Sequence, residues 1–339
     1  MESDSIKVIV ENKIPFFKGL LDDVAEVSYL SPEEITADAV KNTDAIVTRT
    51  RTRCDKNLLE GSRCSLIASA TIGLDHVDVG WCEQNGIEVK NAPGCNAPAV
   101  AQYVFASLLS LGVELEGKCL GIIGAGNVGK IVADWGKQLG MKVIINDPPR
   151  ELVEGKGEFV SLDTIAAEAD VITFHAPYTK NGVFATHHLL DSQLVDKFRC
   201  KPVVINSARG AVTDTKALVK GVADGKISHL IIDCWEGEPE ISRQLLEMAS
   251  VATPHIAGYS LQGKQRASYT AAHEVADKFS LRMKSVPEMQ YLPEKVTEED
   301  IKKSYNPLDD TISLKNAPEM FESLRNNYKL RNEVLFPEQ

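Results

Sequence analysis

The sequence predicts an α/β protein with two domains and a short C-terminal extension. Three observations lead to this fold class. The chain has 339 residues, which is too long for one typical domain. Short apolar runs alternate with amphipathic stretches along most of it, and a glycine-rich turn of pattern G-x-G-x-x-G joins one such run to a helical stretch. We therefore expect two Rossmann-like domains, each a doubly wound parallel sheet.

Eight short runs rich in β-branched residues are the expected strands. They span residues 7–10, 45–48, 66–69, 120–123, 142–145, 171–174, 203–206 and 230–233. Continuous apolar runs of this kind are typical of parallel sheets that helices cover on both faces. The helix expected after Gly126 has one apolar face, made by Val128, Ile131, Val132, Trp135 and Leu139.

The composition restricts the partners. The formal net charge is −11, so neither a nucleic acid nor an anionic membrane is an expected partner. The seven cysteines are scattered and form no C-x-x-C pair, which indicates reduced thiols rather than disulfides or a metal site. No apolar run reaches the roughly 18 residues of a membrane span, and the acidic start is unlike a signal peptide. We expect a cytoplasmic protein that binds no metal.

The residues after about 287 follow a different pattern. Four prolines interrupt them, and residues 294–303 are rich in charge, which is compatible with an appended helical element or a partly mobile extension. Apolar groups in such a segment usually need a partner surface, so we expect residues 287–339 to form the dimerisation segment of a two-fold homodimer. The apolar groups concerned are Phe321, Leu324, Tyr328 and Leu335.

The glycine-rich turn at 124–129 is the expected dinucleotide site. Its first glycine permits a tight turn, its second lets a pyrophosphate approach the backbone, and its third lets the helix pack on the strand, while the helix N-terminus offers N–H groups to the phosphates. The alternative interpretation of this turn is a glycine-rich strand–helix connection that binds no ligand. The residues expected to bind the cofactor here are Gly124, Gly126, Asn127, Val128 and Gly129.

An acidic residue follows the next strand and indicates which dinucleotide binds. The carboxylate of Asp147 would accept hydrogen bonds from the adenosine ribose and repel a 2′-phosphate, so it favours NAD over NADP. Arg150 is the one nearby residue that could weaken this preference, and we interpret it as a solvated loop arginine.

Three polar residues that follow strand-like runs form the expected reacting centre: Arg209, Glu238 and His255. In a doubly wound sheet the carboxyl ends of the strands open on the ligand crevice. A histidine can take up and release a hydroxyl proton near neutral pH, and a carboxylate beside it would orient the ring and favour its charged form. A guanidinium can bind a carboxylate with two hydrogen bonds. Each residue also has a structural interpretation: Arg209 could be a surface ion-pair partner, Glu238 could be simply exposed, and His255 could be a hydrogen-bonded structural residue.

Other polar residues carry weaker signals. If residues 49–53 are extended, Arg49, Arg51 and Arg53 share one face, which could bind a phosphate or could be a solvated strand end. We prefer the second interpretation for Arg53. His76 and His175 are expected to line the structure rather than to react.

Five stretches together resemble the D-isomer-specific 2-hydroxyacid dehydrogenase family. They are residues 91–96, 124–129, 206–210 with Asp214, 233–239 and 254–258. The resemblance implies an NAD-dependent oxidoreductase of split architecture. A substrate-binding domain, 1–97, would be completed by 259–286, and the NAD-binding Rossmann domain, 98–258, would be inserted between the two parts. Gln102 departs from the family, which often has Glu in that helix.

The resemblance also implies roles for individual residues. The catalytic set would be Arg209, Glu238 and His255. Further cofactor contacts would come from Asp147, Ala176, Ser207, Ala208, Arg209, Asp233 and Gly258. The stretches 70–78, 92–97, 147–150 and 255–260 are closest to a branch of the family that acts on a small phosphorylated hydroxy acid. In that branch the substrate would contact Thr50, Thr71 and Tyr259, with Arg49 and Arg51 as the cationic edge for the phosphate.

Two alternatives stay open on the sequence alone. A sibling activity, such as phosphoglycerate, glyoxylate or D-lactate dehydrogenase, would use the same catalytic set. A redox-sensing co-repressor could use the same fold as a binding module. Turnover of a hydroxy acid with NAD would separate the enzymes from the co-repressor.

Overall fold

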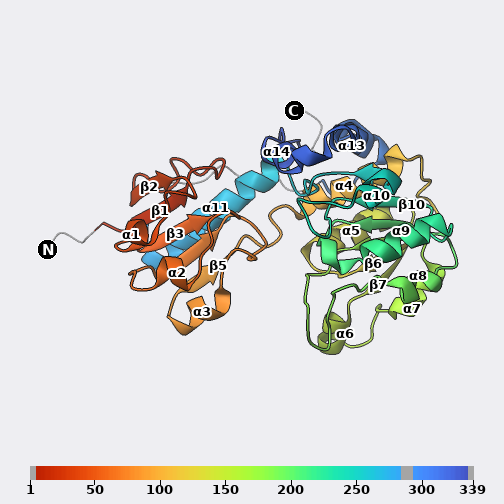
Figure 1. Ribbon diagram of the computed structural model, residues 1–339, viewed down its shortest axis with the longest axis horizontal. Coiled ribbons are helices and arrows are strands. Elements are labelled where there is room, and N and C mark those ends of the chain that lie inside the picture. The colour runs from red at the N-terminus through yellow and green to blue at the C-terminus, as the bar shows by residue number, and fades with distance from the viewer. Residues whose placement is uncertain (1–4, 284–292, 335–339) are drawn as a thin grey trace. The chain divides into compact units, whose positions relative to one another are not determined.

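The computed structural model describes residues 5–283 and 293–334, and the chain divides into two compact units (Figure 1). Unit 1 consists of residues 1–96 and 261–291, and unit 2 of residues 97–260 and 292–339. The first boundaries lie close to the expected ones. The expected separate segment at 287–339 is not observed, because its described part, 293–334, belongs to unit 2. Residues 287–292 and 335–339 of that segment lie outside the described residues.

Unit 1 is a five-stranded parallel sheet in the order β2-β1-β3-β4-β5. Successive residues of a strand point to opposite faces. Val8 and Val10 pack on one face with the alanines of the long helix α11, and Ile9 packs on the other face with the short helices. The elements are β1 (Lys7–Glu11), β2 (Glu26–Leu30), α1 (Ala37–Val40), β3 (Ala45–Thr48), α2 (Lys56–Leu59), β4 (Leu66–Ser69), α3 (Val79–Gln84), β5 (Glu88–Lys90) and α11 (Leu261–Phe279).

Unit 2 is a six-stranded parallel sheet in the order β11-β10-β9-β8-β6-β7. A single bridge between Ile145 and Phe159 stands where a further edge strand would pair with β7. The chain leaves β6 toward β7 on one side and returns to β8 on the other, so the strand order reverses between β6 and β8. The strands are β6 (Cys119–Ile123), β7 (Lys142–Asn146), β8 (Val171–Phe174), β9 (Val203–Asn206), β10 (His229–Ile232) and β11 (Val251–Ala252).

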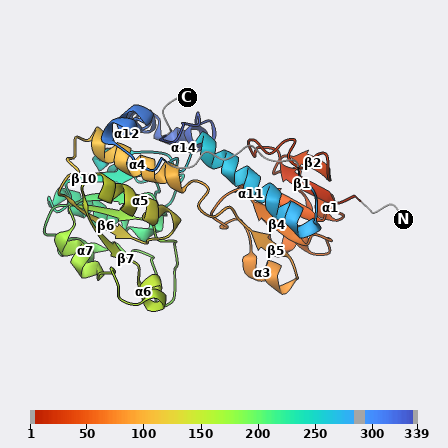
Figure 2. The same ribbon diagram turned by 180° about the vertical axis from the view of Figure 1, so that it is seen from behind.

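Helices cover both faces of this second sheet (Figure 2). The helix expected after Gly126 is confirmed as α5, which buries Val132 and Trp135. The helices before the extension are α4 (Ala97–Ser110), α5 (Asn127–Gln138), α6 (Pro148–Glu154), α7 (Leu162–Glu168), α8 (Ser192–Asp196), α9 (Thr215–Ala223) and α10 (Arg243–Met248), with a 3₁₀ turn at Gly210–Val212. The fold class expected from the sequence is thereby confirmed.

The C-terminal extension is part of the core of unit 2. Its helices are α12 (Glu298–Ser304), α13 (Pro307–Asn316) and α14 (Phe321–Asn326), with a 3₁₀ turn at Pro318–Met320. α12 and α13 pack against α4, which buries all but one of its 14 residues. The expectation that the apolar groups of this segment need a partner molecule is wrong for Phe321, because the same chain leaves it only 1% exposed. Leu335 lies outside the described residues.

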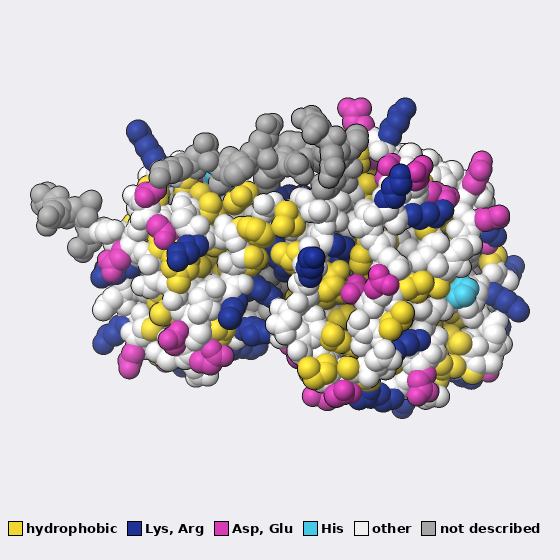
Figure 3. Space-filling model, turned by 90° about the horizontal axis from the view of Figure 1, so that it is seen from above, with side chains coloured by type: hydrophobic (Ala, Val, Ile, Leu, Met, Phe, Trp, Pro, Cys, Tyr) yellow, Lys and Arg dark blue, Asp and Glu magenta, His cyan; other side chains and the backbone are white. Residues whose placement is uncertain are grey.

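The face shown in Figure 3 has no dominant charge of one sign. Lysine, arginine, aspartate and glutamate side chains are interspersed over the face shown in Figure 3. Among the described residues, no helix combines the length and the apolar character needed to cross a membrane.

Candidate active site

The carboxyl edge of the sheet in unit 2 carries most of the expected site residues. Ala176 follows β8, Ser207 to Arg209 follow β9, Asp233 follows β10, and His255 lies three residues after β11. Because all six strands are parallel, these loops lie along one edge. The order reversal between β6 and β8 is the position at which ligands bind in such sheets.

The glycine-rich turn shows why its first and third positions need glycine. Gly124 has a φ of +90°, and a Cβ there would lie 2.6 Å from the backbone nitrogen of Ala176. A Cβ at Gly129 would lie 2.1 Å from the carbonyl oxygen of Gly124. At Gly126 it would meet no atom of the described residues within 4 Å. The space at the start of α5 is therefore open, which suits a phosphate near the helix N-terminus.

Asp147 caps α6 and faces the glycine-rich turn. Its carboxylate accepts hydrogen bonds from the backbone N–H of Ala125 at 2.8 Å and of Arg150 at 3.2 Å. Arg150 is not the solvated loop residue we expected. It lies in α6, pairs with both carboxylate oxygens of Glu154 at 2.7 Å, and donates to the carbonyl of Ala125. The positive charge beside the turn is therefore already paired, which supports the preference for NAD.

Glu238 and His255 form a hydrogen-bonded pair, with 2.6 Å between Oε1 and Nδ1. The second carboxylate oxygen of Glu238 accepts the backbone N–H of Trp235 at 3.1 Å. Burial alone would raise the pKa of Glu238, but the hydrogen bond from His255 and its charge lower that pKa below the usual value. With Nδ1 held by the carboxylate, Nε2 is the ring nitrogen that can exchange a proton with a substrate hydroxyl.

The backbone at His255 adopts a conformation that side-chain residues rarely take, with a φ of +56°. Asp233 forms hydrogen bonds with the two residues that follow His255. Its Oδ1 accepts the N–H of Ile256 at 2.7 Å, and its Oδ2 accepts the N–H of Ala257 at 3.0 Å. Asp233 is 1% exposed, and burial raises the pKa of its carboxyl group despite these bonds. Asp233, which the family resemblance implied as a cofactor contact, thus also supports the loop that follows His255.

Arg209 lies on a loop that is built around Asn206. The Asn206 side chain donates to the carbonyl of Arg209 at 3.0 Å and accepts the N–H of Ala208 at 3.2 Å. Gly210 lets this loop pack on the next one, since a Cβ there would lie 2.1 Å from the backbone of Trp235. The Oγ of Ser207 is buried and has no hydrogen-bond partner among the described residues, so it can accept one from a ligand.

Arg325 is a cation at this site that the sequence did not reveal. It lies in α14, and its Nε donates to the phenol oxygen of Tyr259 at 3.4 Å. Its charge is one of the causes that lower the pKa of Glu238. The carboxylate of Glu322 lies 3.6 Å away and is half exposed. Arg325 is 66 residues from Tyr259 in sequence, in a segment without a motif, so no local pattern could have placed it here.

The expected substrate residues of unit 1 lie where its sheet order reverses, between β1 and β3. Residues 49–53 do not continue the strand, so the condition for Arg49, Arg51 and Arg53 to share one face is not met: β3 ends at Thr48, and the chain then bends. The bend is fixed by the buried carboxylate of Glu11, which accepts the N–H of Arg49 at 3.2 Å and the hydroxyl of Thr52 at 3.1 Å. Thr50 and Arg51 are left exposed.

Two further unit 1 contacts define the surroundings of these residues. Arg49 donates through Nη1 to the carbonyl of Lys13 at 3.0 Å. The hydroxyl of Thr71 lies 2.8 Å from that of Ser69 and donates to the carbonyl of Gly73 at 3.1 Å. Arg49, Arg51 and Thr50 thus follow β3 directly, and Thr71 follows β4.

His76 is buried and His175 is half-buried, and both are in surroundings that disfavour a charged ring. Burial lowers the pKa of His76 to about 4 and that of His175 to about 3. Both stay neutral at physiological pH, so neither can be the acid or base of a reaction that runs near neutrality.

The same two histidines predict an acid-sensitive stability. Below the unfolded-state pKa of 6.5, the two imidazole rings bind protons in the unfolded chain but stay neutral in the folded chain. The free energy of unfolding therefore falls as pH drops. The expected loss between pH 7 and pH 5 is about 2 kcal/mol for each histidine. Urea unfolding at both pH values should show a smaller loss for His76→Phe and for His175→Phe. The exposed His273 is the control, and an effect of His273→Gln as large as theirs would contradict the assignment.

Comparison with known proteins decides the family. Residues 100–257 match the model described as the NAD binding domain of D-isomer specific 2-hydroxyacid dehydrogenase. An erythronate-4-phosphate dehydrogenase from Bacteroides thetaiotaomicron is 44% identical over 339 residues, which is 97% of this chain and 97% of that protein. The chain belongs to the D-isomer-specific 2-hydroxyacid dehydrogenase family. The family expected from the sequence is confirmed, and with it an NAD-dependent dehydrogenase.

Further relatives of this dehydrogenase agree. The erythronate-4-phosphate dehydrogenase of Porphyromonas gingivalis is 35% identical, over 95% of this chain and 92% of its own. These relatives represent the branch expected from the stretches around Asp147 and Tyr259. The D-lactate dehydrogenase of Aquifex aeolicus, solved with NAD and lactic acid, is 28% identical, with a TM-score of 0.68 over 81% of this chain and 95% of that one.

The residues of this dehydrogenase fit NAD. Gly126 leaves the start of α5 open, Asp147 places a carboxylate at the end of β7, and Ser207 offers a buried hydroxyl without a partner among the described residues. These are the three features that a dinucleotide needs from the chain: room for its phosphates, an acceptor for its ribose, and a polar contact along its length.

Proposed function

We propose that this dehydrogenase oxidises 4-phospho-D-erythronate at C2 to 2-oxo-3-hydroxy-4-phosphobutanoate, in the cytoplasm, as a step of pyridoxal 5′-phosphate (vitamin B6) biosynthesis. The observation that carries the proposal is the relative named erythronate-4-phosphate dehydrogenase, which is 44% identical over 97% of both chains. The pairing of Glu238 with His255 at 2.6 Å supports it, since the reaction needs a group that accepts the C2 hydroxyl proton.

The chain's residues divide the work of this reaction. NAD, when bound, supplies the acceptor for the C2 hydride. His255 takes the hydroxyl proton on Nε2, and Glu238 keeps the ring oriented and stabilises the positive charge that the ring acquires. Arg209 binds the carboxylate of the substrate through two hydrogen bonds and holds C2 in place. The further cofactor contacts that we propose are those of Ala176, Ser207, Ala208, Asp233 and Gly258.

The phosphate of the substrate needs a cation other than Arg209. We propose Arg49 and Arg51 of unit 1 for this role, with Thr50, Thr71 and Tyr259 as further substrate contacts. The structure supports adding Arg325, because its guanidinium lies beside the Tyr259 hydroxyl and its nearest carboxylate is half exposed. A chain of net charge −11 needs such local cations to bind a substrate with two anionic groups.

The substrate proposal predicts a selective effect of these arginines. Arg51→Ala and Arg325→Ala should each raise KM for 4-phosphoerythronate by about 10- to 100-fold, the effect of losing one charge-assisted contact. KM for unphosphorylated erythronate should change little. Arg53→Ala is the matched control, since that side chain is 65% exposed and lies near Asp55.

A substrate panel tests the assignment itself. The panel consists of 4-phosphoerythronate, 3-phosphoglycerate, D-lactate and erythronate, with NADH formation as the readout. Of these substrates, 4-phosphoerythronate should give the highest kcat/KM. A higher kcat/KM with 3-phosphoglycerate or D-lactate would contradict the proposed substrate, and only the family assignment would stand. A chain that turns over none of them would favour the binding-module alternative.

We also propose that the dehydrogenase is a homodimer that associates through its extension. Phe321 is buried within the chain, but Ile312 and Met320 of the same segment are 59% and 46% exposed. Light scattering at micromolar concentration should give twice the monomer mass of 37.1 kDa. The double variant Ile312→Lys, Met320→Lys should be monomeric, whereas Val183→Lys, at a side chain 94% exposed elsewhere in unit 2, should remain dimeric. A monomeric wild type, or a dimeric double variant, would contradict this mode of association.

A further inference from the structure

The loop that carries His255 is bound by an arginine from the far end of the chain. Arg331 donates through Nη1 to the carbonyl oxygens of Ile256 at 2.9 Å and Tyr259 at 3.1 Å, and through Nη2 to that of Ala257. Backbone pairing reinforces these contacts, because Ser260 forms a parallel bridge with Arg331. Three carbonyl groups within four residues of His255 thus converge on one guanidinium.

The remaining donors of Arg331 connect the loop to α4. Nε donates to the amide oxygen of Gln102 at 3.0 Å, and Nη2 donates to the carbonyl of Ala99 at 3.1 Å. Gln102 in turn donates to the carbonyl of Asn332 at 2.9 Å. Gln102, the residue that departs from the family pattern, is therefore the partner of the extension.

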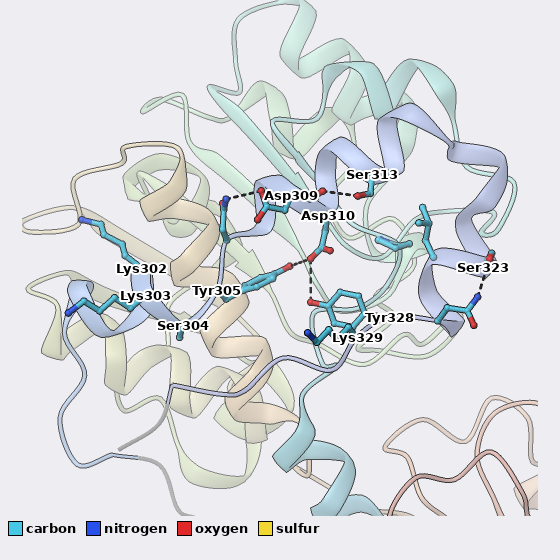
Figure 4. A pocket seen from close by; sticks show the side chains of 14 residues that line it. Lys302, Lys303, Ser304, Tyr305, Asp309, Asp310, Ser313, Ser323, Tyr328 and Lys329 are labelled. Atoms are coloured by element: carbon cyan, nitrogen blue, oxygen red, sulfur yellow. Dashed lines mark hydrogen bonds between the residues drawn. The ribbon is translucent and has the colours of Figure 1, made fainter. Parts of the chain in front are cut away.

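The guanidinium is buried, with Arg331 only 8% exposed. The ring of Tyr305 lies over it at 4.3 Å. Figure 4 shows Tyr305 and Tyr328 pointing toward Asp310, and the two phenols donate to its carboxylate at 2.7 Å and 3.3 Å. A buried cation is tolerated only when its hydrogen bonds are satisfied. Here carbonyl oxygens of the His255 loop accept several of the guanidinium's hydrogen bonds. Movement of the loop would therefore leave donors of a buried cation without acceptors.

The opposite side of the same loop is bound by an anion. Asp233 accepts hydrogen bonds from the N–H groups of Ile256 and Ala257, and Arg331 donates hydrogen bonds to the carbonyl groups of the same two residues. The peptide groups after His255 are thus held between a buried carboxylate and a buried guanidinium. A backbone with a φ of +56° persists only where its surroundings determine it from several directions.

We propose that Arg331 is a positioning residue of the dehydrogenase, which acts through the 256–259 backbone to hold the His255 imidazole at the angle that proton transfer requires. The proposal rests on the proposed role of His255 as the acid–base group. It makes the C-terminal extension a functional part of the active site, in addition to its part in the core. The 256–259 loop also carries Tyr259, so the position of a proposed substrate contact depends on the same guanidinium.

The test compares Arg331→Met and Arg331→Lys with wild type, using whichever 2-hydroxy acid the wild type oxidises best. Arg331→Met should lower kcat about 10- to 100-fold, the cost of misplacing a reacting group by about 1 Å. KM for NAD should change by a smaller factor than kcat, because most of the proposed cofactor contacts lie outside the 256–259 loop and Gly258 is the one within it. The pH–rate profile should change shape, and Arg331→Lys, which keeps the charge and can still reach one carbonyl, should recover part of kcat.

A second variant separates positioning from stability. Leu314 is fully buried in α13 and belongs to the core cluster of Phe174 and Phe321, whereas Ala257 of the loop belongs to the other core cluster of unit 2. Leu314→Ala should lower Tm at least as much as Arg331→Met but keep kcat and the pH–rate profile when assayed well below Tm. Should Arg331→Met fail to fold, Arg331→Lys carries the comparison. Wild-type kcat and pH profile in the Arg331 variants, or an equal loss of kcat in Leu314→Ala, would overturn the proposal. A failure of 4-phosphoerythronate as substrate would overturn only the proposed function.

Discussion

His255→Asn is expected to lower kcat by about 10²–10⁴-fold, the usual contribution of general acid–base catalysis. Asparagine has a similar size and can keep a hydrogen bond to Glu238, but it cannot accept the substrate proton. NAD should still bind with wild-type affinity, which calorimetric titration can measure, because the glycine-rich turn and Asp147 lie on other strands. A His255→Asn enzyme with near-normal kcat would show that the assignment is wrong.

The chain contains a matched control for this substitution. His188 pairs with Glu236 at 2.6 Å, the same distance as His255 with Glu238 but through Nε2 in place of Nδ1, and both partners are about one third exposed. His188→Asn should keep kcat within about three-fold of wild type, since it lies outside the proposed catalytic set. In the catalytic pair, Glu238→Gln removes the charge that stabilises a protonated imidazole. Its pH–rate profile should therefore move toward lower pH, and an unmoved profile would argue against the pair.

Phe321→Ala is expected to lower the free energy of unfolding by about 3–5 kcal/mol, the cost of removing a large aromatic side chain from a core. Phe321 is 1% exposed and belongs to the same apolar cluster as Ile123 and Phe174 of the sheet. Its chain neighbour Met320 is 46% exposed, so Met320→Ala should change stability by less than about 0.5 kcal/mol. Urea unfolding of the two variants measures the difference, and similar values for both would contradict the packing.

Deletion of residues 293–339 extends this prediction. The described part of the extension, 293–334, contributes five buried aliphatic or aromatic side chains to unit 2: Val296, Ile301, Leu314, Phe321 and Val334. At about 1.5–3 kcal/mol each, their loss approaches the whole stability of a typical domain, about 5–15 kcal/mol. Deletion would also uncover α4, which is apolar on nearly all sides. We expect the shortened chain to be insoluble or unfolded, and a folded, active product would contradict the integral role of the extension.

Local patterns in the sequence determined most of the two sheets and the cofactor loop. Buried parallel strands read as continuous apolar runs because both of their faces pack, so β3, β4, β6, β8 and β9 could be placed within a residue. Gly124 and Gly129 could be assigned because their backbone geometry excludes a side chain. Asp147 follows β7 directly, Glu238 and His255 lie in the loops after β10 and β11, and the end of a parallel strand is a position that sequence alone can locate.

Only the tertiary structure decided the parts that depend on residues far apart in the chain. The bend after β3 could not be read from the alternating Arg49–Arg53 pattern, because it is imposed by the buried carboxylate of Glu11, 38 residues before Arg49. The role of Asp233 beneath its loop, the approach of Arg325 to Tyr259 and the binding of Arg331 to the His255 loop arise in the same way. Each depends on side-chain hydrogen bonds to groups that packing brings together, and such bonds leave no periodicity in the sequence. The extension looked like a separate segment because its prolines and charges interrupt the pattern of its few apolar residues, whereas the structure shows that α12 and α13 pack against α4.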